Sequence, residues 1–270
     1  MSVLVTVYNG EHTIARALDS LLSQDFGEGC GFEIVVVNDG STDRTREILR
    51  QFEQNHSHVR VIDLQRVGRA RALNVGLKAC RAPYVAVNDA DDLSHAHRLR
   101  RQYDYMEKHP NVSLVSGWAR VVDDDGKLIE ERRLDDNDKV LRTRLALGNP
   151  FVHSTIMYRK SALERIGGFN ESMKAAIDYD AIERLACFGR LAVLQDFVVT
   201  HYRGKGQFFR SNLDPSVRWR AAAGVAVRAA RHHAKLLLPV SFLVYVLTWT
   251  PLAGWLWRHL YPIYSRLIAK

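Results

Sequence analysis

The sequence has 270 residues, of which 47% are hydrophobic and 25% charged, a composition that suits a buried core and excludes a disordered chain. The length suits one large domain, or a domain with an appendage. The whole net charge of +8 comes from the end of the chain, because residues 215–270 carry eight Lys and Arg and no Asp or Glu. We therefore expect a domain over residues 1–213 and a basic tail over residues 214–270.

The first third of the sequence alternates short apolar strands with amphipathic helices. Strands are predicted at residues 3–8, 33–38, 59–64 and 84–87, and helices at 11–24, 39–52 and 68–80. Ser41 or Thr42 is the expected N-cap of the second helix. This alternation indicates an α/β protein with a mostly parallel sheet flanked by helices.

After residue 110 the pattern changes. Asp124-Asp125-Gly126 marks a turn between two strands, which predicts a β-hairpin. A helix is expected over 136–147, a strand over 153–159, helices over 160–169 and 177–189, and a final strand or pair of strands over 190–203.

Polar clusters follow three of the predicted strands, at Tyr8-Asn9, at residues 38–41 and at residues 88–92. Ligands of parallel sheets bind beyond these carboxyl ends. The third cluster, "NDADD", fits either a solvated turn or a site for Mg²⁺ or Mn²⁺. In an extended segment residues i and i+2 point the same way, so Asp89 and Asp91 can face one ion while Asp92 caps the next helix.

Four motifs in order make the chain resemble the family 2 glycosyltransferases of the GT-A fold. They are "SVLVTVYNG" (2–10), "VVNDGSTDRT" (36–45), "VNDADD" (87–92) and "GGFNESMKAAIDYDAIERLACFG" (167–189). The resemblance covers about residues 2–203. It implies a Rossmann-like GT-A domain that transfers one sugar, with inversion, from a nucleoside-diphosphate sugar, with a UDP-sugar as the favoured donor.

The resemblance also implies roles for individual residues. Asp89 and Asp91 would be the DXD pair that holds Mg²⁺ or Mn²⁺ on the donor diphosphate, and Asp178 would be the catalytic base. The implied nucleotide-binding residues are Thr6, Tyr8, Asn9, Asp39, Arg71 and Asp89. The chain departs from the family at Asn38 and Ile177, where the family has Asp and Glu. His153 and His201 lie near these motifs, and we expect structural roles for both.

The tail contains 22 uncharged residues, 236–257, flanked by basic residues on both sides. As a helix this run could cross a bilayer, but Pro239 and Pro251 divide it. We expect an interfacial or re-entrant attachment of residues 214–270 to the cytoplasmic face of a membrane, and hence a lipid-linked acceptor in surface polysaccharide or glycolipid synthesis. A single kinked span and a subunit interface are the alternatives. Nucleic-acid binding is not expected, because the run is apolar.

Two other functions remain open, a nucleotidyltransferase and a catalytically silent partner that binds a nucleotide sugar. The former would leave Asp178 unused and usually needs a Gly-rich basic loop, where this chain has "YNGEHT". The start of the chain lacks the features of an export signal, which favours the cytoplasm. Cys30, Cys80 and Cys187 are therefore expected as buried, reduced thiols rather than disulfides or zinc ligands.

Overall fold

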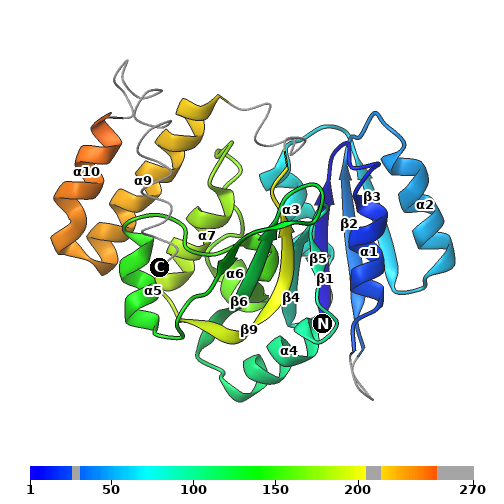
Figure 1. Ribbon diagram of the computed structural model, residues 1–270, viewed down its shortest axis with the longest axis horizontal. Helices are drawn as coiled ribbons and strands as arrows, with labels where there is room; N and C mark the ends of the chain where they lie inside the picture. The colour runs from blue at the N-terminus through cyan, green and yellow to red at the C-terminus, as the bar shows by residue number, and fades with distance from the viewer. Residues whose placement is uncertain (26–30, 205–213, 248–270) are drawn as a thin grey trace.

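The strands of the protein form one mixed sheet flanked by helices (Figure 1). The computed structural model describes residues 1–25, 31–204 and 214–247. Across the sheet the strand order is β3-β2-β1-β4-β8-β6-β9-β5, and β7 pairs with β6. The strands are β1 (Ser2–Val7), β2 (Glu33–Asp39), β3 (Val59–Leu64), β4 (Tyr84–Asp89), β5 (Leu93–Ser94), β6 (Val112–Val122), β7 (Leu128–Arg132), β8 (Met157–Arg159) and β9 (Arg190–Tyr202).

Helices cover both faces of this sheet. They are α1 (Ile14–Leu22), α2 (Thr45–Asn55), α3 (Arg69–Ala79), α4 (Arg98–Lys108), α5 (Asp138–Leu145), α6 (Lys160–Arg165), α7 (Ile177–Ala186), α9 (Pro215–His233) and α10 (Leu238–Leu247), with 3₁₀ turns η1 (His153–Thr155) and η2 (Lys235–Leu237). Side chains of α3, α5, α7 and α9 share one hydrophobic core, and those of α1, α2 and α4 share the other. Successive strand residues alternate between the two cores, as Leu4 and Val5 do, because side chains along a strand point to opposite faces.

The parallel half of the sheet matches the prediction and positions the polar clusters. β1 lies between β2 and β4 and runs parallel to both. Thr6 is in register with Val37 on one side and with Asp89 on the other. The polar residues that follow β1, β2 and β4 therefore meet at one edge of the sheet.

The second half departs from the mostly parallel sheet that the sequence predicted. β8 runs antiparallel to both β4 and β6, and β5 and β7 also pair antiparallel with their neighbours. Antiparallel neighbours need no helical crossover, and the predicted hairpin supplies one such pair. The strand expected over 153–159 begins as the turn η1, and residues 190–202 form one strand, β9.

The predicted cap of the second helix is wrong. α2 begins at Thr45, and the carboxylate of Asp43 accepts hydrogen bonds from the backbone N–H and the hydroxyl of Thr45. Ser41 and Thr42 are engaged elsewhere: the Ser41 hydroxyl accepts from Asn9 N, and Asn9 Oδ1 accepts from Thr42 N at 2.8 Å. The loops after β1 and β2 thus bind each other rather than capping the helix.

The region predicted as a basic tail begins inside the domain. Val225 and Ala229 of α9 are fully buried and belong to the core that α5 and α7 share. Arg228 forms ion pairs with two buried carboxylates of α7, Asp180 and Glu183. α9 is therefore held by burial and charge, whereas the prediction placed this basic helix on lipid.

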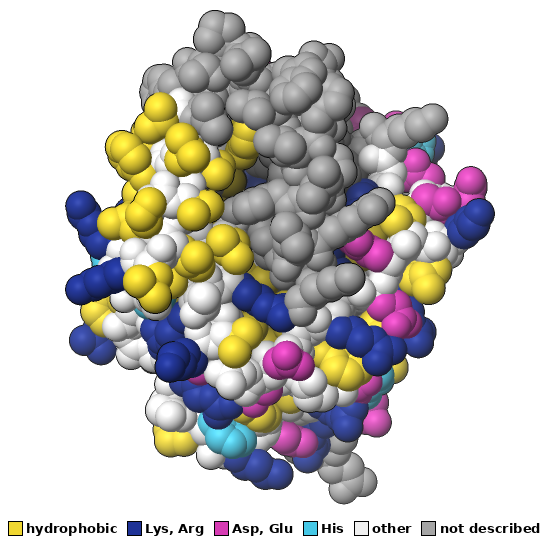
Figure 2. Space-filling model, turned by 60° about the vertical axis from the view of Figure 1, so that its left-hand side comes forward, with side chains coloured by type: hydrophobic (Ala, Val, Ile, Leu, Met, Phe, Trp, Pro, Cys, Tyr) yellow, Lys and Arg dark blue, Asp and Glu magenta, His cyan; other side chains and the backbone are white. Residues whose placement is uncertain are grey.

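Beyond α9 the chain exposes apolar side chains. Figure 2 shows them gathered on one face, with Lys and Arg nearby. Those of α10 and the turn before it are Leu236, Val240, Phe242, Leu243 and Val246. Within the described ranges, no helix combines the length and apolarity that a membrane crossing requires. Residues 248–257 of the predicted apolar run lie outside the described residues.

Candidate active site

Arg69, at the start of α3, connects the predicted metal ligands with the predicted base. Its guanidinium donates to Asp89 Oδ1 at 2.5 Å. Burial by itself would lower the pKa of Arg69, but the charges of Asp89, Asp178 and Asp91, in that order, outweigh burial and raise it. All three carboxylates therefore lie within electrostatic reach of one guanidinium, although they come from distant parts of the sequence.

The carboxylate of Asp89 is held ionised by its surroundings. Burial opposes ionisation, but the charge of Arg69 and the imidazole of His153 together lower the Asp89 pKa. His153 is buried, and its Nδ1 lies 3.1 Å from the Arg69 guanidinium. Its Nε2 has no hydrogen-bond partner among the residues that the structure describes. His153, expected to be structural, thus lies against the acidic cluster.

Asp92 is a buried carboxylate, and the prediction that it caps the next helix is wrong. Its side chain is fully buried and accepts hydrogen bonds from the Ser154 hydroxyl, from His201 Nδ1 at 2.9 Å and from Tyr202 N at 3.0 Å. Burial alone would lower the pKa of His201, but Asp92 raises it. Asp92 therefore joins β9 and the turn η1 to the end of β4.

A fully buried cation, Arg98, supports the acidic turn. Arg98 is fully buried and donates to Asn88 Oδ1 and to Val87 O, both at 2.9 Å. Burial lowers the pKa of Arg98 to about 9, against the opposing charges of Asp92 and Asp89. Asn88 in turn donates to Asp92 O at 3.1 Å. This network fixes the backbone that presents Asp89 and Asp91.

Asp178 lies in the first turn of α7 and is half-buried. Asn149 donates to its Oδ2 at 2.7 Å, which fixes the orientation of the carboxylate. The helix follows Ala176, whose φ of 55° is a left-handed conformation uncommon for alanine, and such strain concentrates at functional sites. Asp180 points elsewhere and pairs with Arg184 at 2.7 Å, so the two acids of α7 have separate roles.

The predicted nucleotide pocket contains an arginine that sequence reasoning did not identify. The guanidinium of Arg66 lies 3.5 Å from the centre of the Tyr8 ring and forms an ion pair with Asp39. Asp39 also accepts hydrogen bonds from the backbone N–H groups of Val67 and Gly68. The carboxylate expected to bind the nucleoside thus holds the loop before α3, and Arg66 occupies one face of the Tyr8 ring.

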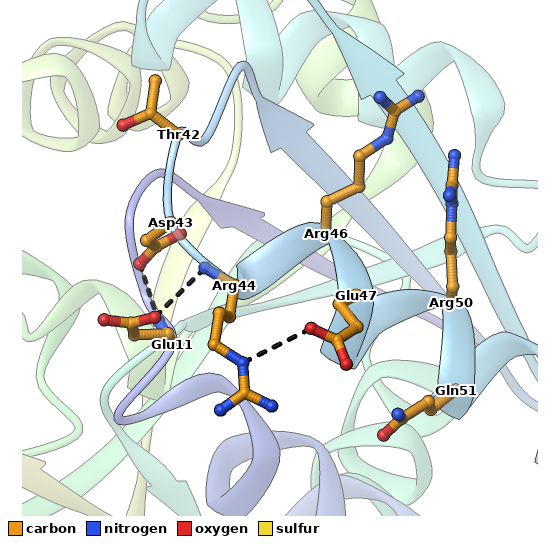
Figure 3. A pocket seen from close by; sticks show the side chains of 8 residues that line it. All are labelled: Glu11, Thr42, Asp43, Arg44, Arg46, Glu47, Arg50 and Gln51. Atoms are coloured by element: carbon orange, nitrogen blue, oxygen red, sulfur yellow. Dashed lines mark hydrogen bonds and ion pairs between the residues drawn. The ribbon is translucent and has the colours of Figure 1, made fainter.

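Two cavities lie at this end of the domain. One, of about 640 Å³, is lined by residues of α2 and of the loops near its start, three of them arginines: Glu11, Thr42, Asp43, Arg44, Arg46, Glu47, Arg50 and Gln51 (Figure 3). None of the predicted site residues lines it. The other, of about 490 Å³, includes Asn38, Gly40 and Arg66 in its wall. Tyr8 and Asp39 do not line this second cavity, but Arg66, which does, contacts both of them.

The sequence model of glycosyl transferase family 2 matches residues 2–167, more than half of the chain. The chain belongs to glycosyl transferase family 2. EpsE of Bacillus subtilis (strain 168), named a glycosyltransferase, is 33% identical over 171 residues, which are 63% of this chain and 59% of EpsE. The amylovoran biosynthesis glycosyltransferase AmsE of Erwinia amylovora is 29% identical over 192 residues, 70% of each chain. The present chain thus spans less than two thirds of EpsE.

Solved structures show the same fold. Residues 1–349 of S. aureus TarS in complex with UDP-GlcNAc give a TM-score of 0.68 at 23% identity, covering 90% of this chain and 70% of that one. The mannosyltransferase PcManGT from Pyrobaculum calidifontis, in complex with GDP-Man and Mn²⁺, gives 0.62 at 22% identity, covering 94% and 74%. At such identities the likeness establishes the mixed α/β, Rossmann-like fold of this family 2 member. The family match favours a glycosyltransferase over the nucleotidyltransferase alternative.

The residues of this family 2 chain fit a hard divalent cation. Asp89 and Asp91 would supply carboxylate oxygens, the donors that Mg²⁺ and Mn²⁺ prefer, and a cation bound by Asp89 would share that carboxylate with Arg69. Arg71, the arginine expected to reach a phosphate, is exposed on α3, and Arg69 two residues earlier makes the contact with the cluster instead. The two positions differ by about 200° around a helix, so only one can face the site.

Thr6 completes the set of predicted residues and is half-buried beside Asp89 in the sheet. Arg69, Arg66, Arg98 and Asn149 were not predicted as site residues. Arginines at helix starts are common on solvated faces, so type and spacing alone gave no reason to choose Arg69 over Arg71. The one indication in the sequence was Gly68 directly before Arg69. Its φ of +92° forms a turn that directs the Arg69 side chain toward the sheet.

Proposed function

We propose that this chain transfers one sugar from a nucleoside-diphosphate sugar to an acceptor hydroxyl, with inversion at the anomeric carbon. The observation that carries the proposal is the ion pair of Arg69 with Asp89, within electrostatic reach of Asp91 and Asp178. It is supported by relatives in fold whose complexes contain UDP-GlcNAc, or GDP-Man with Mn²⁺. A UDP-sugar is the favoured donor. The AmsE likeness supports a role in polysaccharide synthesis.

In this proposal the carboxylate of Asp178 accepts the proton of the acceptor hydroxyl as its oxygen attacks the anomeric carbon. The bond from that carbon to the diphosphate oxygen breaks, and its electron pair leaves with the nucleoside diphosphate. Mg²⁺ or Mn²⁺, held by Asp89 and Asp91, would neutralise charge on the leaving diphosphate. Asn149 keeps Asp178 oriented through its hydrogen bond to Oδ2.

Donor binding is tested by thermal shift with UDP, GDP, dTDP and CMP, each with and without Mn²⁺. A ligand that binds only the folded state raises Tm with its concentration relative to Kd. We expect one diphosphate to stabilise the wild type only with metal, and Asp91→Ala to lose that effect. If the diphosphate raises Tm equally with and without metal, and does so in Asp91→Ala as well, the acidic cluster does not bind the metal.

Catalysis is tested separately with Asp178→Asn. The amide has the shape of the carboxylate and can still bond to Asn149, but it cannot accept the proton. We expect donor binding to persist while transfer falls at least about 100-fold, within the range for loss of a general base. Transfer at the wild-type rate would show that another group is the base. If the wild type binds the donor but transfers no sugar to any acceptor, the result favours the catalytically silent partner instead.

We also propose that the region 214–270 attaches to the cytoplasmic face of a membrane through the apolar side chains around α10, and that the acceptor is lipid-linked. The exposed side chains of Phe242 and Leu243 support this. Flotation with anionic vesicles should recover the wild type but not Phe242→Asp/Leu243→Asp. A wild type that fails to float and forms an oligomer that the double variant dissociates would assign the surface to a subunit interface.

A further inference from the structure

Four potential metal ligands meet between α7 and α9, outside the acidic cluster. They are Glu183 and Cys187 at the end of α7, and His232 and His233 at the end of α9. One ligand atom from each lies within 4.8 Å of the others. Cys187 was expected to be buried, but its side chain is exposed. A metal ion could therefore enter from solvent.

The distances are close to those of a tetrahedral site. Cys187 Sγ lies 3.6 Å from His232 Nδ1 and 3.9 Å from His233 Nε2. Ligands around Zn²⁺ should be about 3.5 Å apart for S···N and about 3.3 Å for N···O, given usual bond lengths. Glu183 Oε1 and His232 Nδ1, now 2.7 Å apart in a hydrogen bond, would need to separate by about half an ångström.

Ion pairing alone accounts for only part of this cluster. Glu183 is 1% exposed, and its buried charge needs partners, which Arg228 and His232 provide at 3.5 Å and 2.7 Å. That pairing leaves out Cys187 and His233, although the thiol also donates to Glu183 O at 3.7 Å. A thiol is a weak hydrogen-bond donor and acceptor, so its approach to two imidazoles gains little without a metal.

We propose that Glu183, Cys187, His232 and His233 bind one Zn²⁺. A thiolate, two imidazoles and a carboxylate form a borderline-soft set that favours Zn²⁺ over Mg²⁺ or Mn²⁺. The negative charges of the thiolate and the carboxylate balance the ion. Glu183 Oε1 becomes the ligand while Oε2 stays paired with Arg228. The proton of the thiol, and any proton held between Glu183 and His232, passes to solvent.

The site would tie α9 to the helix that carries Asp178. Cys187 follows the last turn of α7, and His233 is the last residue of α9. One ion bound by both residues would therefore link the ends of the two helices. This inference does not depend on the sugar-transfer proposal, because no residue is shared between the two sites.

Cobalt substitution tests the site directly on the full-length, metal-stripped protein. Co²⁺ bound to a thiolate gives a charge-transfer absorption that Co²⁺ on carboxylates lacks. We expect a band that saturates at one equivalent, is abolished by Zn²⁺ and is unaffected by excess Mg²⁺. Cys187→Ala should remove the band, whereas the variant Cys30→Ala/Cys80→Ala, in which Cys187 is the only thiol, should retain it.

Histidine variants and melting temperatures complete the test. His233→Ala should weaken Co²⁺ binding at least about tenfold, the lower bound for loss of a supporting group, while His12→Ala, which removes a 90% exposed imidazole, should not. Zn²⁺ should raise Tm of the wild type but not of Cys187→Ala, whose Tm without metal verifies folding. A wild type with no saturable band, or a band that survives Cys187→Ala, overturns the proposal whatever the outcome of the sugar-transfer assays.

Discussion

Replacement of Asp92 by alanine distinguishes a buried carboxylate from a helix cap by the size of its effect. Loss of a cap costs about 1 kcal/mol. In the structure Asp92 is fully buried, accepts three hydrogen bonds, and lies beside the guanidinium of Arg98 and the imidazole of His201. Removing one partner of such a buried arrangement costs about 3–5 kcal/mol, because it leaves the other charges uncompensated. We expect Asp92→Ala to destabilise the fold by that larger amount.

Urea unfolding, followed by tryptophan fluorescence, measures this difference from the shift in midpoint. Asp125→Ala is the control, because Asp125 is exposed in the β6–β7 turn and its loss should change stability by no more than about 0.5 kcal/mol. Asp92→Asn should be intermediate, since the amide keeps the volume and one acceptor but not the charge. If Asp92→Ala lowers the free energy of unfolding by about 1 kcal/mol or less, the buried network is refuted and Asp92 acts as a helix cap.

Three further changes follow from contacts elsewhere in the fold. Glu33 accepts hydrogen bonds from a hydroxyl and a backbone N–H, and these outweigh burial and lower its pKa from 4.5. Its ionised form therefore stabilises the folded protein above that pH. Glu33→Gln should be less stable than the wild type by roughly 2 kcal/mol at pH 7, and this difference should vanish as pH falls through the pKa of Glu33 in the folded state. Arg228→Ala should cost about 2 kcal/mol in urea unfolding by depriving two buried carboxylates of a partner, whereas the exposed Arg231→Ala should be neutral. Gly40 has φ +73°, and a Cβ there would lie 2.5 Å from the backbone N of Arg66, so Gly40→Ala should lower Tm and abolish the nucleotide-induced thermal shift. If the nucleotide-induced thermal shift of Gly40→Ala equals that of the wild type, Arg66 is not part of the nucleotide site.

The regular elements were predictable because local signals and burial agree in them. β1, β2 and β4 read as continuous apolar runs and lie in the middle of the sheet, with their polar ends at one edge. Spacing also separated Asp178 from Asp180, since residues two apart face different sides of a helix. The family motifs marked Asp89 and Asp91, and their position at the end of β4 agrees with a site.

The rest depended on contacts between segments far apart in the sequence. Asp92 has the composition of a cap, and only the approach of β9, more than 100 residues later, makes it a buried acceptor. Arg69 and Arg71 are equivalent in type, and the direction of α3 against β4 decides between them. The charge asymmetry at residue 214 suggested a detached segment. The charge asymmetry did not predict the ion pairs of Arg228 with carboxylates of α7, because they depend on which face of α7 does not pack against the sheet.

α7 therefore serves two sides of the molecule at once. Its first turn holds Asp178 toward Asn149 and Arg69, while Asp180 and Glu183 are bound by Arg228 of α9. The contacts of Asp178 and Asp180 hold the first turn of α7, and that of Glu183 holds its middle. If lipid or another subunit binds the region after residue 214, as proposed above, Arg228 and α7 lie between that surface and Asp178.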